Sequence, residues 1–155
     1  MRYLAICFIN VVASIFISCV DKPNCDYTEG QKLYFAHTFN FDISKLRGEN
    51  YLYILPIESC EGCVYSNLNF LKDIKSEKLT IIFVGENHKL SWVEMINKIR
   101  SNLKTLDDPL KKVYNYETGL RKPLLILMYD GNCINSQTVN DTEVTKVFSS
   151  LSLGD

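Results

Sequence analysis

The stretch that decides the fold reads Tyr51-Leu-Tyr-Ile-Leu-Pro-Ile-Glu-Ser-Cys60-Glu-Gly-Cys63-Val-Tyr-Ser-Asn-Leu-Asn-Phe-Leu-Lys72. It opens with apolar and aromatic residues, the composition of a buried strand, and it breaks at Pro56. Cys60 and Cys63 follow, with two residues between them. Beyond Cys63 the apolar residues recur at the spacing of one helix face, as Val64, Leu68, Leu71 and Ile74. The stretch therefore predicts a strand, a Cys-x-x-Cys turn and a helix.

A Cys-x-x-Cys pair at the start of a helix is a chemically active arrangement. Unpaired backbone N–H groups and the helix dipole favour an anion at this end of a helix. The thiolate is the reactive form of cysteine, so the pKa of the first thiol is expected to fall. We expect Cys60 to be exposed and to attack a disulfide, and Cys63 to lie deeper and to resolve the mixed disulfide.

Two other roles for Cys60 and Cys63 are a structural disulfide and half of a zinc site. Structural zinc usually takes four ligands. The remaining candidates do not form a second close pair, so zinc is disfavoured; they are Cys25, Cys133, His37 and His88. Cys25 and Cys133 either pair with each other or are two free thiols, and the sequence leaves that choice open.

Length and composition indicate one globular domain. The chain has 155 residues, of which 46% are hydrophobic and 23% charged. Its formal net charge is −1, without a run of Lys or Arg, which disfavours nucleic-acid binding.

The N-terminus has the pattern of an export signal. Met1-Arg2 is followed at residues 3–17 by an apolar run that is too short for a membrane span of about 20 residues. The run ends Phe16-Ile-Ser-Cys19, which resembles a bacterial lipobox. We expect a signal peptide at 1–18, lipidation at Cys19, a tether at 19–32 and the folded domain at 33–155. An ordinary secretory signal and an uncleaved anchor are the alternatives, and all three place the domain outside the cytoplasm.

The rest of the chain predicts alternating strands and helices. Strands are expected at 51–57, 79–85, 124–129 and 133–139, helices at 61–76, 89–104 and 143–153, and a turn at 130–132. Residues 33–41 favour an edge strand or hairpin arm, 42–48 a turn, and 113–116 a short extended piece. Strand, helix and strand at 51–85 imply a parallel pair, which brings the loop 85–88 near Cys60. His88 in that loop is a minor candidate for proton transfer.

This order resembles the thioredoxin fold, and the chain is most similar to the membrane-tethered thiol–disulfide oxidoreductases of the TlpA/ResA type. The motifs are the Gly48-terminated lead-in, Cys60-Glu61-Gly62-Cys63, and Lys122-Pro123 before a strand with an Asp130-Gly131 turn. The resemblance implies a three-layer α/β/α sandwich with a central mixed sheet. It also implies that Cys60 is the nucleophile, that Cys63 is the resolving thiol and that Lys122-Pro123 forms a cis-proline substrate loop.

The sequence departs from the family around the motif. Ser59 replaces a usual Trp, Glu61-Gly62 replaces a common Gly-Pro, and Ile54 stands where thioredoxin has a buried acid. Glu61 is either a solvated acid of the first helical turn or a modulator. As a modulator it disfavours the Cys60 thiolate, which predicts a more reducing potential than that of strong oxidants of the DsbA type.

We therefore expect a lipid-anchored monomer of the bacterial cell envelope, facing the periplasm or the cell exterior. It would exchange disulfides with envelope proteins, as a reductant, and receive electrons from an upstream donor. The resemblance implies no cofactor and no metal besides the Cys60–Cys63 dithiol. The alternative is a non-catalytic thioredoxin-like binding module in which Cys60 and Cys63 form a structural disulfide.

Overall fold

The computed structural model describes residues 25, 29–87, 89–120 and 122–151. The predicted signal peptide, the lipidation site Cys19 and the loop residue His88 lie outside the described residues. Among the residues that are described, no helix is long and apolar enough to span a membrane.

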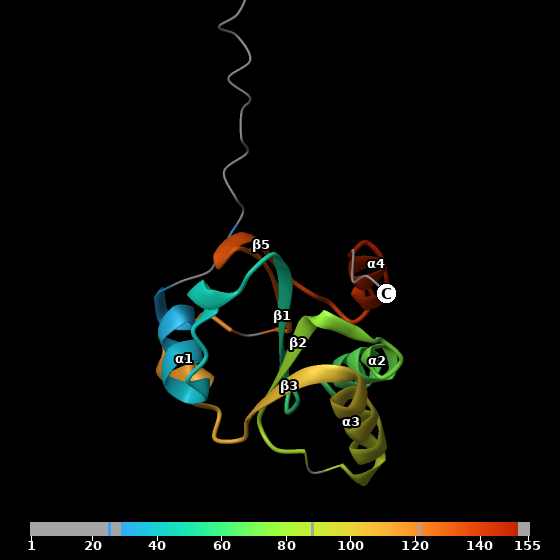
Figure 1. The fold of residues 1–155 in the computed structure, drawn as a ribbon. Helices are drawn as coiled ribbons and strands as arrows, with labels where there is room; N and C mark the ends of the chain where they lie inside the picture. The colour runs from blue at the N-terminus through green and yellow to red at the C-terminus, as the bar shows by residue number, and fades with distance from the viewer. Residues whose placement is uncertain (1–24, 26–28, 88, 121, 152–155) are drawn as a thin grey trace, which may run out of the picture.

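A five-stranded mixed sheet forms the centre of the molecule (Figure 1). Its strand order is β3-β2-β1-β4-β5, with parallel pairing of β1 with β2 and of β2 with β3, and antiparallel pairing of β1 with β4 and of β4 with β5. In chain order the elements are α1 (Glu29–Phe39), η1 (Ile43–Lys45), β1 (Glu49–Pro56), α2 (Glu61–Leu71), β2 (Ser76–Val84), α3 (Leu90–Asn102), β3 (Leu103–Asp108), η2 (Lys112–Asn115), β4 (Leu124–Tyr129), β5 (Asn132–Thr138) and α4 (Val144–Ser149).

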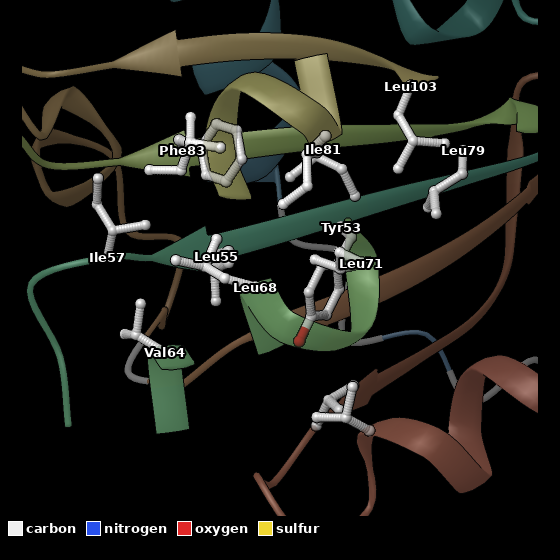
Figure 2. Packing of buried hydrophobic residues seen from close by; sticks show 14 of the residues in the cluster. Tyr53, Leu55, Ile57, Val64, Leu68, Leu71, Leu79, Ile81, Phe83 and Leu103 are labelled. Carbon is white, nitrogen blue, oxygen red and sulfur yellow. The ribbon is translucent and has the colours of Figure 1, made fainter. Parts of the chain in front are cut away.

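The two faces of the sheet carry separate hydrophobic clusters, because successive side chains of a strand point to opposite faces. Tyr53 and Leu55 of β1 pack with α2, α3 and α4 (Figure 2). Leu52 and Ile54 pack on the other face with α1. Right-handed crossovers place α2 and α3 on one face, since β2 and β3 follow β1 in the same direction across the sheet. The predicted fold class, a thioredoxin-like α/β/α sandwich with a mixed central sheet, is confirmed.

The prediction of a strand at residues 33–41 is wrong. Residues 33–39 belong to helix α1, which begins at Glu29, inside the predicted tether, and ends at Phe39. Tyr34 and Phe35 are 0% exposed, and they pack edge-on or tilted against Phe39 and other aromatic side chains. The aromatic residues suit a strand by propensity, but packing them against one face of the sheet requires the helix.

Several element ends also differ from prediction. Residues 103–108 form the edge strand β3, where the sequence predicted only the end of a helix. Residues 112–115 form a 3₁₀ turn in place of an extended piece. Helix α2 ends at Leu71, and β2 begins at Ser76, earlier than predicted. Helix α4 spans only Val144–Ser149.

The β4–β5 hairpin confirms the predicted turn and corrects the predicted proline isomer. Asp130 and Gly131 both have positive φ, 47° and 77°, which suits a two-residue hairpin turn. The described residues contain no cis peptide bond, so Lys122–Pro123 is trans and the cis expectation is wrong. Trans is the lower-energy isomer even before proline. In this isomer the Pro123 carbonyl accepts a 2.8 Å hydrogen bond from the Val139 amide and closes the open end of the hairpin.

Candidate active site

Cys60 and Cys63 lie at the N-terminus of α2, as predicted. Cys60 is the N-cap residue, and its sulfur accepts a hydrogen bond from the Cys63 amide at 3.4 Å. Cys60 is exposed, Cys63 is half-buried, and both are free thiols. The outer sulfur is therefore open to a partner, while the inner sulfur sits behind it within the same helical turn.

The pKa values of the two thiols are shifted in opposite directions. The pKa of Cys60 is lowered, chiefly by the hydrogen bond from the Cys63 thiol and then by the Cys63 amide. The pKa of Cys63 is raised, first because its thiol donates to Cys60 and next because it loses solvent. The Asp141 carboxylate raises the pKa of both thiols. Of the two thiols, Cys60 therefore ionises more readily and Cys63 holds its proton more firmly.

Glu61 is an exposed acid of the first helical turn, one of the two roles that the sequence left open. Its carboxylate pairs with Lys89 at the start of α3, and its side chain is 72% exposed. The carboxylate that opposes the Cys60 thiolate is Asp141, from the loop after β5. Sequence reasoning missed Asp141 because it is 81 positions from Cys60 (141 − 60), and only the fold brings it into range.

Glu58 joins the chain before Cys60 to the neighbouring loops. Its carboxylate accepts a 3.0 Å hydrogen bond from the Glu86 amide and pairs with Lys111. Gly85 (φ +100°) lies so close that a Cβ there would sit 2.9 Å from Glu58 Cγ. This contact confirms that the described part of loop 85–88 lies beside the redox turn. A pocket of about 340 Å³ opens here, lined by Ser59, Glu61, Lys89, Trp92 and other residues.

The buried side of the turn contains a polar contact that the sequence did not reveal. The hydroxyl of Tyr53 on β1 donates to the Asn67 side chain, whose amide donates to the Cys63 carbonyl at 2.7 Å. Tyr53 and Asn67 are both 0% exposed. A single Asn in an apolar helix face is the only signal that could have pointed to it.

Lys122 and Pro123 lie at the end of the sheet that leads to the cysteines. Leu124 pairs with Ile54, so Pro123 falls one position further along, opposite Leu55 near the carboxyl end of β1. Pro123 is buried, and the Lys122 ammonium reaches the Asn140 side chain at 3.4 Å. The Lys122-Pro123 loop therefore lies at the same end of the sheet as the cysteines, in the trans form.

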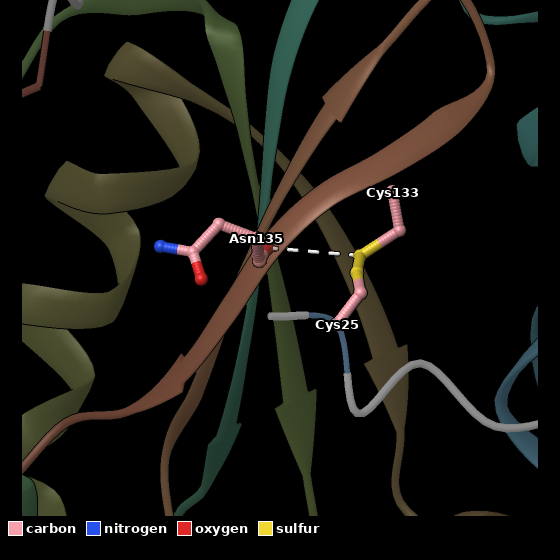
Figure 3. The surroundings of a disulfide bond; sticks show 3 residues. All are labelled: Cys25, Cys133 and Asn135. Carbon is pink, nitrogen blue, oxygen red and sulfur yellow. Dashed lines mark hydrogen bonds between the residues drawn. A yellow bond between two sulfur atoms is a disulfide. The ribbon is translucent and has the colours of Figure 1, made fainter. Parts of the chain in front are cut away.

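The other two cysteines form a disulfide, which resolves the choice that the sequence left open. Cys25 and Cys133 are bonded, with their Cα atoms 6.2 Å apart (Figure 3). The Cys133 sulfur also lies 3.7 Å from the Asn135 carbonyl oxygen; a disulfide sulfur carries no hydrogen, so this is a polar contact. Cys133 pairs with Met128 near the hairpin turn, at the opposite end of β4 from Pro123. The part of the chain that the structure describes holds no cluster of three or more potential metal ligands.

Comparisons with known proteins give only distant structural similarities. No protein-family model matches the chain, and no curated protein matches its sequence. Similar solved structures include a peroxiredoxin-like protein from Aquifex aeolicus, at 12% identity over 68% of this chain and 74% of that one, with a TM-score of 0.41. The pneumococcal exposed lipoprotein thioredoxin from Streptococcus pneumoniae is 18% identical over 70% of this chain and 90% of that one, with a TM-score of 0.39. A DsbF homologue from Corynebacterium diphtheriae is 17% identical over 67% of this chain and 72% of that one, with a TM-score of 0.34.

Proposed function

We propose that the protein is a thiol–disulfide oxidoreductase of the bacterial cell envelope that exchanges disulfides with other proteins through Cys60 and Cys63. One observation carries the proposal. An exposed Cys60 with a lowered pKa caps α2, and a half-buried Cys63 with a raised pKa lies one turn further on. Exchange needs an accessible thiolate and a second thiol held in reserve.

The proposed reaction runs in two displacements. The Cys60 thiolate attacks a client disulfide, forms a Cys60–client bond and releases one client thiolate, which takes a proton from water. Cys63 then loses its proton and attacks the Cys60 sulfur. The Cys60–Cys63 bond forms, the Cys60–client bond breaks, and the second client thiolate leaves. Two electrons pass from the dithiol to the client, and an upstream donor restores the dithiol.

We propose that the protein reduces its clients. Measurement of the reduction potential of the Cys60–Cys63 pair tests this direction. The argument from Glu61 loses weight, because Glu61 is paired with Lys89. Asp141 takes its place as the carboxylate that opposes the Cys60 thiolate and so destabilises the reduced form.

An extracytoplasmic location fits the covalent structure. Disulfides persist in oxidising compartments and are rare in the cytosol. The Cys25–Cys133 bond therefore supports export, in agreement with the signal-like N-terminus. Anchoring through lipid at Cys19 belongs to the proposal, and acyl labelling of the wild-type chain and of Cys19→Ala tests it.

The second candidate is a binding module whose Cys60 and Cys63 form only a structural disulfide. One observation favours this module: the Lys122–Pro123 bond of the predicted substrate loop is trans, where the resemblance implied cis. The exposure of Cys60 argues against it, because structural disulfides are usually protected.

A redox titration with thiol trapping separates the two. The domain is equilibrated in glutathione buffers, and alkylation at Cys60 and Cys63 is read by mass. An exchange catalyst gives a reversible two-electron transition, and Cys63→Ser accumulates a Cys60-linked client. A Cys60–Cys63 bond that resists reduction until the domain unfolds, with no client trapped, contradicts exchange. Cys60→Ser/Cys63→Ser is the matched control for trapping.

A further inference from the structure

A buried polar chain connects the central strand to the resolving cysteine. It runs from the Tyr53 hydroxyl on β1 to the Asn67 amide on α2 and on to the Cys63 carbonyl. Helix geometry already provides that carbonyl with the backbone N–H four residues further on. The Asn67 amide is therefore not needed to satisfy it. A buried amide costs free energy unless it is fully paired. Here its oxygen accepts from the Tyr53 hydroxyl, and its nitrogen donates to the Cys63 carbonyl in the redox turn.

Tyr53 is itself held on several sides. Its ring meets Phe148 of α4 edge-on, with centroids 5.0 Å apart and planes at 88°. Its position on β1 is set by pairing with Ile81 of β2 and Leu125 of β4. Burial raises the pKa of Tyr53 far above its ordinary value, so the hydroxyl remains a donor. The Tyr53 side chain is therefore packed in place, and its hydroxyl keeps its proton.

The outer side of the redox turn is open to solvent, and its contacts are made by exposed side chains such as Glu61, which pairs with Lys89. Cys60, Glu61 and Gly62 are all exposed. A Cβ added at Gly62 would meet no atom within 4 Å, so open space lies beside it. The turn is therefore held at Cys63 and open at Cys60.

We infer that Asn67 is a positioning residue for the resolving step, in which it and Tyr53 hold the Cys63 backbone in place while Cys60 carries the client. This inference rests on the proposed exchange function. In that step the Cys63 sulfur forms its bond to the Cys60 sulfur as the Cys60–client bond breaks. Asn67 and Tyr53 form and break no covalent bond and transfer no proton.

The test uses the disulfide dithiobis(nitrobenzoate), which reports the two displacements separately. The first coloured thiolate appears when Cys60 attacks, and the second when Cys63 resolves the mixed disulfide. Asn67→Leu removes the buried amide at similar size, and Tyr53→Phe keeps the ring but removes its hydroxyl. Asn69→Leu is the matched control, because Asn69 is an exposed residue of the same helix whose side chain accepts a hydrogen bond from Lys72.

We expect Asn67→Leu to slow the second release about tenfold and Tyr53→Phe to slow it less, as loss of a directed hydrogen bond would. The first release should stay within about twofold of wild type, and the pH midpoint of the second release should not move, because the effect is one of geometry. Tyr53→Phe carries the test if Asn67→Leu does not fold.

Two results would overturn this role for Asn67. One is an unchanged second release in the folded variants. The other is equal slowing of both releases, which would indicate general damage to the site. A wild-type chain whose Cys60 gives no rapid first release contradicts the exchange function itself, and the role of Asn67 with it. Asn69→Leu should match wild type in both releases.

Discussion

Removal of the Cys25–Cys133 disulfide should destabilise the domain mainly through its unfolded state. The bond joins residues 108 positions apart. The chain-entropy relation, 2.1 + 1.5R ln n cal/mol/K, gives about 4.8 kcal/mol at 25 °C for a loop of that size. A domain of this size is stable by about 5–15 kcal/mol, so the loss would be a third or more of the total. The double variant Cys25→Ser/Cys133→Ser makes the change without leaving a single thiol to mispair.

The assay is guanidinium unfolding and refolding in a Cys60→Ser/Cys63→Ser background, so that exchange with the redox pair does not interfere. The midpoint should fall by roughly 1 M for a loss of this size. Because the bond constrains the unfolded chain, the refolding rate should drop and the unfolding rate should change little. A loss below about 1 kcal/mol, or one seen mainly as faster unfolding, would refute the entropic reasoning.

Two smaller changes test the electrostatics of the site and the hairpin. Asp141→Asn removes the carboxylate that raises the pKa of Cys60 and Cys63. The pH midpoint for alkylation of Cys60 should therefore move further down, whereas Glu143→Gln on the same loop should leave it in place. Gly131→Ala puts a Cβ 2.6 Å from a backbone oxygen at φ +77°. It should lower the free energy of unfolding by about 1–3 kcal/mol, and a thermal midpoint equal to wild type would contradict the geometry.

The sequence predicts the centre of this fold well and its edges poorly, for physical reasons. Strand β1 is apolar on both faces, as a strand between two helical layers must be, so its period and burial can be read directly. The edge strand β3, Leu103–Asp108, has four polar residues and no strict alternation, so little in its sequence distinguishes it from a helix end. Helix α1 places Tyr34 and Phe35 side by side, which favours a strand in isolation. Their packing into the hydrophobic cluster on the α1 face of the sheet is what favours the helix, and the local sequence does not contain that information.

The candidate site divides in the same way. Cys60 and Cys63 can be identified because the motif, the preceding strand and the following helix are contiguous in sequence. Asp141 and Tyr53 act on the same turn from distant or buried positions. Their roles depend on pairing between strands and on side-chain direction, which local patterns do not encode.

The disulfide also determines how the domain would carry a mechanical load. A pull on the chain ahead of Cys25 enters the body at Cys133 in β5, because the sulfur bridge is a covalent path. Helix α1 lies inside the closed loop and bears none of that load. The 108 positions spanned by the bridge correspond to roughly 370 Å of extended chain that cannot be drawn out. Reduction of that one bond would move the load to α1 and release this length.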